Sequence, residues 1–253
     1  MAVTFSQLGH LGRMGNSMFQ IAAVIGYARK YKQDYVLPIW EYAKNFKYNF
    51  NQSAVIKSVS VYREKSFHYT SIPKYHNVDL YGYFQSIRYW EHCQIEIRNL
   101  FSPNESIQAI LDKSPIIINT CAIHVRRTDY LGLQNYHPSL PLDYYQRAIN
   151  AMKEGNVERF IVFSDDIEWC KIQDVFKGNQ FSFINSGNDL LDFFIMCESD
   201  KFIIANSSFS WWASYLSTGL NKRIIAPKKE YWFGTKYNMN NVDDLYLSLW
   251  ELV

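Results

Sequence analysis

The chain has 253 residues, of which 48% are hydrophobic and 20% charged, proportions that are ordinary for a folded globular protein. Its 26 basic and 24 acidic residues leave a formal net charge of +2, so the chain as a whole has no general attraction to nucleic acid or to an anionic membrane. The four cysteines are widely spaced and form no Cys-x-x-Cys pair, which argues against a zinc site or a dense disulfide framework. Since no apolar run approaches the roughly 18 residues of a membrane span, we expect a cytoplasmic protein without a transmembrane segment.

The first part of the chain contains a glycine-rich turn between a predicted strand and a predicted helix. Gly9, Gly12 and Gly15 precede a run of apolar residues at helical spacing. Residues 41–76 are aromatic and polar with weak periodicity, so no element is predicted there. The predicted strands of this part are 2–8, 34–40 and a short one beginning at 78, and the predicted helices are the one after the glycine turn, one from about 86 to 101, and 104–112.

From residue 115 onward, strands and helices alternate regularly. The predicted strands are 115–125, 159–166, 181–185, 201–206 and 222–229, and the predicted helices are 142–154, 167–176, 189–199 and 208–218. Near-continuous apolar strands with helices between them indicate a parallel sheet covered on both faces. We therefore predict an α/β protein of two lobes, 1–112 and 113–253, with the last ~20 residues as a segment that can pack back on the first lobe.

The segment "HVRRTD" (124–129) places a histidine, two arginines and an aspartate at the end of a predicted buried strand. Consecutive residues of an extended chain point to opposite sides, so Arg126 and Arg127 should have different roles. One guanidinium can fork onto phosphate oxygens, while the other pairs with a carboxylate such as Asp129. The alternative is a surface ion-pair cluster, but ligands of open α/β sheets bind at the carboxyl ends of strands, which favours a functional site.

Two further strand ends carry polar residues. In "FSDD", Ser164 and Asp165 either cap the next helix or present a carboxylate that recognises the adjacent donors of guanine. In "IIANSSFSWW", Asn206, Ser207 and Ser208 begin a helix, so that backbone N–H groups, hydroxyls and the helix dipole converge as in an anion site. Serine capping alone is the alternative for this segment.

The glycine turn "GHLGRMGN" can also bring backbone N–H groups close to a phosphate, although a purely structural turn explains it equally well. It matches neither G-x-G-x-x-G nor a P-loop. The chain has no Asp-x-Asp motif for Mg²⁺ or Mn²⁺ beside a nucleotide diphosphate. Arginine and helix N-termini would then have to neutralise a diphosphate, and we expect no metal and no cofactor.

These segments, in this order, resemble the bacterial α-1,2-fucosyltransferases. The matching stretches are "GRMGNSMFQIA", "HVRRTDYL", "FSDDIEWC", "DLLDFFIMCESDKFIIANSSFSWWASYL" and "IIAPKKEYWF", and they span nearly the whole chain. The resemblance implies a GT-B fold of two Rossmann-like lobes with a cleft between them. It further implies transfer of L-fucose with inversion from GDP-β-L-fucose to the 2-hydroxyl of a terminal β-galactoside, without a metal. A location at a membrane where glycans are assembled would suit that activity.

The resemblance also implies roles for single residues. Arg126 would bind the β-phosphate and His124 would lie against the nucleotide. Asp129 would order the loop or act as the base, the alternative being an ion pair with Arg127. The other predicted donor-binding residues are Ser164 or Asp165 with Asp192 at guanine or ribose, Ser207, Ser208 and Phe209 at the diphosphate, and Gly15 with Asn16 over the sugar phosphate.

The chain departs from the family pattern at Ser17, where glutamine is usual, and at Arg13, where an apolar residue or glycine is common. Its middle region is also short, which leaves acceptor choice open. Two alternatives to an α-1,2-fucosyltransferase are a non-catalytic module that binds a GDP-sugar or a glycan, and an inverting transferase with another donor, acceptor or linkage. Turnover that requires a galactoside would exclude the non-catalytic module. Competition among nucleotide sugars would distinguish a fucosyltransferase from a transferase that uses another donor.

Overall fold

The computed structural model describes residues 1–47, 50, 59–113 and 120–253, and the chain divides into two compact units. The first unit comprises Met1–Ala109 with Asn240–Tyr246, and the second comprises Ile110–Met239 with Leu247–Val253. A short segment near the C-terminus thus belongs to the first unit, although the chain on both sides of it belongs to the second. None of the described helices is both long enough and apolar enough to cross a membrane.

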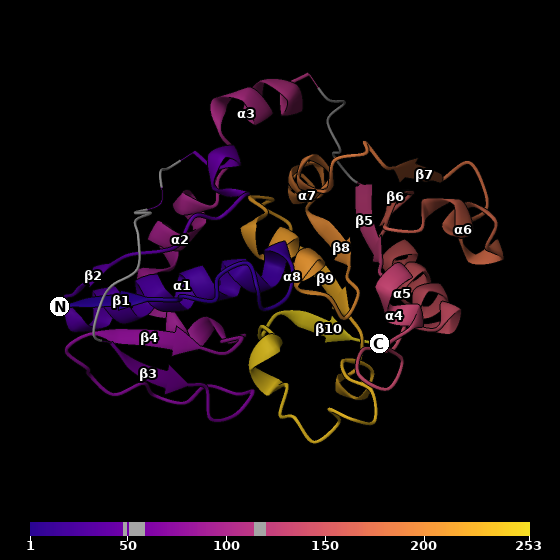
Figure 1. The fold of residues 1–253 in the computed structure, drawn as a ribbon. Helices are drawn as coiled ribbons and strands as arrows, with labels where there is room; N and C mark the ends of the chain where they lie inside the picture. The colour runs from indigo at the N-terminus through magenta and orange to yellow at the C-terminus, as the bar shows by residue number, and fades with distance from the viewer. Residues whose placement is uncertain (48–49, 51–58, 114–119) are drawn as a thin grey trace. The chain divides into compact units, whose positions relative to one another are not determined.

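The first unit contains a sheet of four parallel strands in the order β2-β1-β4-β3 (Figure 1). The strands are β1 (Ala2–Thr4), β2 (Asp34–Tyr35), β3 (Ser60–Arg63) and β4 (Val78–Tyr81). The sequence does not predict β3, which lies in the weakly periodic stretch. β2 ends well before the predicted limit at residue 40, and Pro38, which has no N–H group to donate, follows it.

The main helix of the first unit is α1 (Met14–Tyr31), which is buried on most sides from Met14 to Ala28. The turn before it places Gly9 and Gly12 at positive φ angles of 81° and 83°, a region that favours glycine. The helix ends at Tyr31 and is capped by Lys32, which has a left-handed conformation and whose N–H group bonds to the Ala28 and Arg29 carbonyls. The glycine turn and the helix predicted here are confirmed, but the predicted strand 2–8 is correct only as far as Thr4.

The predicted helix from 86 to 101 is wrong in its first half. The chain instead forms two 3₁₀ turns, η2 (Ile87–Tyr89) and η3 (Glu91–Cys93), before α2 (Gln94–Leu100). Trp90, between the two turns, leaves helical geometry at φ −134° and buries its ring against Phe19 at 5.6 Å. Burial of a large ring has overridden local helix propensity. The remaining elements before the second unit are η1 (Ala43–Asn45) and α3 (Glu105–Leu111).

The second unit contains a sheet of six parallel strands in the order β10-β9-β8-β5-β6-β7. The strands are β5 (Thr120–Val125), β6 (Arg159–Ser164), β7 (Phe181–Ile184), β8 (Lys201–Ile203), β9 (Arg223–Ala226) and β10 (Trp250–Leu252). The parallel sheet is confirmed, and β10 is an edge strand that the sequence does not predict. The predicted beginning of β5, residues 115–119, lies outside the described residues.

Helices cover both faces of this sheet (Figure 1). On one face α5 (Leu142–Glu154) and α6 (Ile167–Lys171) pack on a core that includes Ile123, Val125 and Phe160. On the other face α7 (Asp189–Cys197) and α8 (Ser208–Leu216) pack together, with Phe193 and Phe209 5.4 Å apart. The short elements are α4 (Thr128–Leu131), η4 (Asp174–Phe176), η5 (Lys229–Tyr231) and, in the first unit, η6 (Asp243–Leu245). The predicted helix 167–176 is therefore split into α6 and η4.

Candidate functional site

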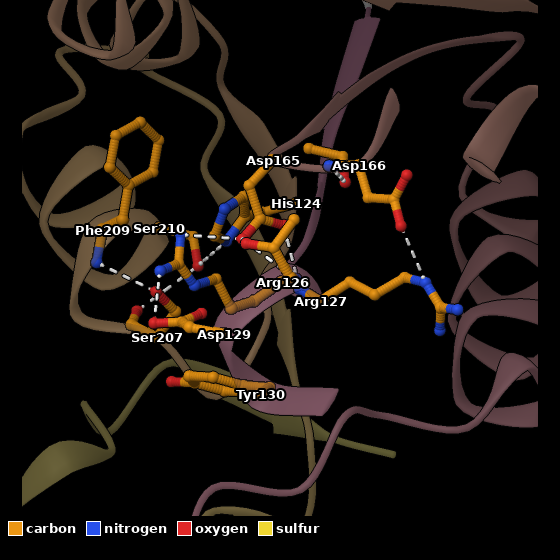
Figure 2. Close-up of polar contacts among 12 residues, drawn as sticks. His124, Arg126, Arg127, Asp129, Tyr130, Asp165, Asp166, Ser207, Phe209 and Ser210 are labelled. Carbon is orange, nitrogen blue, oxygen red and sulfur yellow. Dashed lines mark hydrogen bonds and ion pairs between the residues drawn. The ribbon is translucent and has the colours of Figure 1, made fainter. Parts of the chain in front are cut away.

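Polar residues meet at the carboxyl ends of three neighbouring strands of the second unit, β8, β5 and β6 (Figure 2). β5 is buried along its whole length and alternates between the two faces of the sheet. Ile123 and Val125 face α5, whereas His124 faces α8, where it contacts Ser210. The chain leaves the strand at Arg126, so the first arginine continues on the α8 side.

Arg126 is bound by two carboxylates. Its Nη2 donates to Asp129 Oδ2 at 2.8 Å, and its Nη1 lies 3.1 Å from Asp165 Oδ2. The side chain is only 13% exposed. Burial works against the charge, but the hydrogen bond to Asp129 and the charge of Asp165 outweigh it and raise the pKa of Arg126. The guanidinium is thus a fixed positive charge in a partly buried position, with further N–H groups to offer.

Arg127 points away from Arg126, as the alternation predicts (Figure 2). Its Nε donates to Asp166 Oδ2 at 3.0 Å, and its guanidinium lies 4.1 Å from the centre of the Trp169 ring on α6. The carboxylate paired with Arg127 is therefore Asp166, and Asp129 pairs with Arg126. The predicted pairing of Arg127 with Asp129 is wrong because Arg127 lies on the α6 side of the sheet.

Asp165 connects β6 to the segment that follows β5. Its Oδ1 accepts the Arg127 N–H at 2.9 Å, and its Oδ2 accepts both the N–H and the hydroxyl of Thr128, at 3.2 and 2.5 Å. Together with the contact to Arg126, the carboxylate fixes the whole turn after the strand. A contact of Asp165 with guanine or ribose stays a prediction, since the structure engages this side chain inside the unit.

His124 is buried and stacks on Phe209, with the ring centres 5.1 Å apart. Its Nδ1 lies 2.9 Å from the hydroxyl of Ser210, which also accepts the N–H of Ala205 at 3.3 Å. Burial, and then the charge of Arg126, lower the pKa of His124 to about 3. The imidazole is therefore neutral at physiological pH, and it connects the strand that carries Arg126 to the first turn of α8.

The N-terminus of α8 lies beside this turn. Ser207 is the N-cap, and its hydroxyl accepts the Phe209 N–H at 3.4 Å. Asn206 is 3% exposed, and its Nδ2 donates to the carbonyls of Pro138 and Tyr231 at 2.9 and 3.1 Å. The hydroxyl of Tyr130 donates to the Asn206 carbonyl at 2.9 Å. The loop of Arg126 and the start of α8 are thus connected in one network.

The remaining predicted residues of the second unit have local roles in the structure. The Ser164 hydroxyl accepts the Asp166 N–H at 2.9 Å in the turn before α6, whose N-cap is Asp166 and has no side-chain cap bond. Asp192 Oδ1 accepts the Ser186 N–H at 3.1 Å in the loop before α7, whose N-cap is Asn188. Ser208 is the first residue of α8. Contacts of these residues with a nucleotide stay predictions.

Gly15 and Asn16 belong to the first unit, where both lie in the first turn of α1. Asn16 Oδ1 accepts a hydrogen bond from Gln85 Nε2 at 2.6 Å. A Cβ at Gly12 would lie within 2.0 Å of the Asn16 amide, so the turn before the helix requires glycine there. The predicted role of Gly15 and Asn16 over a sugar phosphate stays a prediction.

Sequence reasoning missed two residues of the network. Tyr130 and Ser210 contribute through contacts to residues 76 and 86 positions away, which no local pattern reveals. Their positions inside the two predicted segments were the only available signal. Among the described residues, no group of three or more His, Cys, Asp or Glu side chains is placed to bind a metal ion, and the four cysteines are free thiols.

Comparisons with known proteins add to this geometry. The chain is 32% identical over 184 residues to the O-antigen biosynthesis glycosyltransferase WbnK of Escherichia coli, covering 68% of this chain and 59% of that protein. It is 32% identical over 176 residues to an Escherichia coli α-1,2-colitosyltransferase, covering 66% and 60%. It is also 24% identical over 239 residues to the human galactoside α-(1,2)-fucosyltransferase 1, covering 82% and 64%. The chain thus spans about three-fifths of the length of these relatives.

Two solved structures share the fold. The NodZ α-1,6-fucosyltransferase soaked with GDP-fucose matches with a TM-score of 0.55 and 12% identity, over 91% of this chain and 96% of that one. POFUT1 in complex with GDP-fucose matches with a TM-score of 0.54 and 12% identity, over 89% and 97%. The predicted α/β fold of GT-B type is confirmed by these likenesses. The family model for glycosyl transferase family 11 matches residues 28–251, and the chain therefore belongs to this family of glycosyltransferases.

Proposed function

We propose that this chain transfers L-fucose from GDP-β-L-fucose to the 2-hydroxyl of a terminal β-galactoside, with inversion and without a metal ion. The observation that carries the proposal is the fixed guanidinium of Arg126, connected through Tyr130 and Asn206 to the start of α8. Fixed positive charge beside a helix N-terminus suits a departing diphosphate. Family membership and two relatives named for α-1,2 transfer support the reaction and its linkage.

In the proposed reaction the bond between fucose C1 and the β-phosphate oxygen breaks, and its electron pair stays on GDP. The acceptor hydroxyl attacks C1 from the opposite face, its proton passes to a base, and the anomeric configuration inverts. Arg126 and the first N–H groups of α8 stabilise the charge that develops on the diphosphate, which is worth several kcal/mol per preorganised donor. Asp129 binds Arg126 at 2.8 Å, and this contact favours an orienting role for Asp129 over that of the base.

The experiment is a GDP-release assay with GDP-fucose, run with and without a panel of β-galactosides, with the product linkage determined by NMR. We expect release that requires a galactoside, an α-1,2 product, and unchanged rates in EDTA. Galactoside-independent binding without turnover would instead indicate a non-catalytic module. Competition with GDP-mannose and UDP-galactose tests the donor, and EDTA-sensitive activity would refute transfer without a metal ion.

A second donor has a specific observation in its favour, because one of the relatives at 32% identity is named as a colitosyltransferase. Colitose is L-fucose without its 3-hydroxyl group, so the two donors share GDP and most of the sugar. A direct comparison of kcat/KM for GDP-fucose and GDP-colitose on the same acceptor decides between them. A preference for GDP-colitose of about tenfold or more, or about 1.4 kcal/mol, would replace fucose in the proposal while leaving the anion site intact.

A further inference from the structure

The first unit contains a cavity of about 270 Å³ that involves none of the residues of the candidate functional site. One face of α1 lines it with Ala23, Tyr27 and Lys30, which are spaced so that they share one side of the helix. The rest of the lining comes from Tyr69 and Ile72, and from Arg88, Tyr89 and His92 in the 3₁₀ turns. The cavity is thus lined by both tyrosine rings and basic side chains.

The tyrosine rings are held rigidly by backbone contacts. The Tyr27 hydroxyl donates to the Pro73 carbonyl at 3.2 Å and accepts the Tyr75 N–H at 2.8 Å. The Tyr89 hydroxyl accepts the Thr70 N–H at 3.2 Å, and the Tyr69 ring packs 4.9 Å from that of Tyr89. Because these contacts hold the Tyr27 and Tyr89 hydroxyls and the Tyr69 ring in place, the rings offer fixed apolar carbon surface to the cavity, as in sites that pack against the face of a sugar ring.

The cations at the cavity lack carboxylates at hydrogen-bond distance among the residues that the structure describes. Lys30 Nζ lies 3.2 Å from the Ser71 hydroxyl. Arg88 Nη1 lies 3.8 Å from Asp244 Oδ1, and its guanidinium lies 4.4 Å from the centre of the Tyr69 ring. Asp244 itself accepts the Tyr69 N–H through its other oxygen at 2.5 Å. Both cations can therefore donate to an incoming anion.

We propose that this cavity binds an anionic pyranose, that is, a sugar ring carrying a carboxylate or a phosphate. The tyrosine surface contacts the ring, and Lys30 and Arg88 bind the charged group. The volume lies just below the range of ordinary small-molecule sites, so it suits one sugar ring rather than an oligosaccharide. If the proposed function holds, on which this role rests, the site anchors a charged unit of the glycan acceptor.

The test is a ligand-observed NMR titration of the full chain with four probes: glucuronate, glucose 6-phosphate, glucose and inorganic phosphate. We expect glucuronate, glucose 6-phosphate or both to bind, about tenfold or more tightly than neutral glucose and than inorganic phosphate. The two anionic sugars distinguish a carboxylate from a phosphate ligand. Equal binding of glucose would refute the role of charge, equal binding of inorganic phosphate would refute the role of the ring, and no binding would refute the site.

Two variants test whether the anionic sugar binds in this cavity. Arg88→Gln and Lys30→Gln change exposed side chains, and each should weaken the anionic sugar about tenfold. The matched control is Arg63→Gln, which removes another exposed arginine of the same unit that stacks on a tyrosine, 4.3 Å from the Tyr81 ring. Binding that persists in both cavity variants would overturn the proposal. The probes contain no transferable fucose, so failure of this test is distinct from failure of the proposed transfer.

Discussion

The guanidinium of Arg126 and the carboxylate of Asp165 lie 3.1 Å apart at the ends of neighbouring parallel strands, β5 and β6. The same carboxylate accepts three hydrogen bonds from Arg127 and Thr128. Asp165 therefore fixes both the backbone after β5 and the direction of the arginine. If Arg126 binds a diphosphate as proposed, its position depends on Asp165 even if Asp165 itself contacts no ligand.

Asp165→Asn should lower kcat/KM for the nucleotide-sugar donor about ten- to a hundredfold, because hydrogen bonds to charged groups contribute about 1.5–3 kcal/mol each. The KM for the acceptor should change little. Steady-state kinetics with calorimetric titration of GDP measure both effects. The control is Asp174→Asn, which breaks an exposed ion pair with Lys177 and should leave activity unchanged. An active Asp165→Asn enzyme with normal GDP affinity would show that the positioning is dispensable.

The two arginines should respond differently to lysine. Arg126→Lys retains charge but loses the fork that faces Asp129 and Asp165, so kcat/KM should fall about a hundredfold or more. Arg127→Lys loses the contact with the Trp169 ring and should mainly lower stability, by about 0.5–2 kcal/mol. Kinetics and urea unfolding of both proteins give the comparison. Equal losses of activity would contradict the division between the two side chains.

Two substitutions at Ser207 distinguish a role in helix capping from a role in anion binding. Ser207→Ala should destabilise the protein by about 1 kcal/mol through loss of the N-cap. Ser207→Asp restores a good cap, so stability should return, but its negative charge should repel a diphosphate and reduce GDP affinity about tenfold or more. Thermal unfolding and GDP titration test the pair of variants. Normal GDP binding by the aspartate variant would place the diphosphate away from this helix end.

His124 should make the fold less stable in acid. Burial, and the charge of Arg126, lower its pKa to about 3, whereas an unfolded histidine has a pKa of about 6.5. Between these values the unfolded chain binds a proton that the folded chain does not, so this contribution to stability is lost as the pH falls from about 6.5 towards 3. Urea unfolding of wild type and His124→Gln between pH 7 and 4.5 measures it. A wild type that loses no more stability than the variant would contradict the expectation.

Glu64 should have the opposite effect. Burial raises its pKa to about 7, although the carboxylate accepts the N–H groups of Tyr83 and Phe84. Since the folded pKa lies above the unfolded value, its contribution to stability is present below about pH 4.5 and is lost as the pH rises through 7. Glu64→Gln should therefore lose less stability than wild type between pH 5 and 8. The same unfolding experiment gives the result, and parallel curves would contradict it.

The sequence by itself determined the parallel α/β organisation of the second unit, because buried parallel strands must be apolar and helices must separate them. It also indicated which polar residues meet in the structure, since polar residues that interrupt apolar strands at their carboxyl ends gather at one edge of the sheet. The opposite directions of Arg126 and Arg127 follow from strand alternation alone.

Tertiary structure decided which carboxylate pairs with which arginine. Asp129 is the nearest acidic residue in sequence, but Arg127 lies on the α6 face and meets Asp166, while Arg126 lies on the α8 face and takes Asp129 and Asp165. It also decided the break at Trp90, where burial of the ring outweighed helix propensity. Such contacts join residues on different elements, and their energies depend on burial and distance that no local pattern contains.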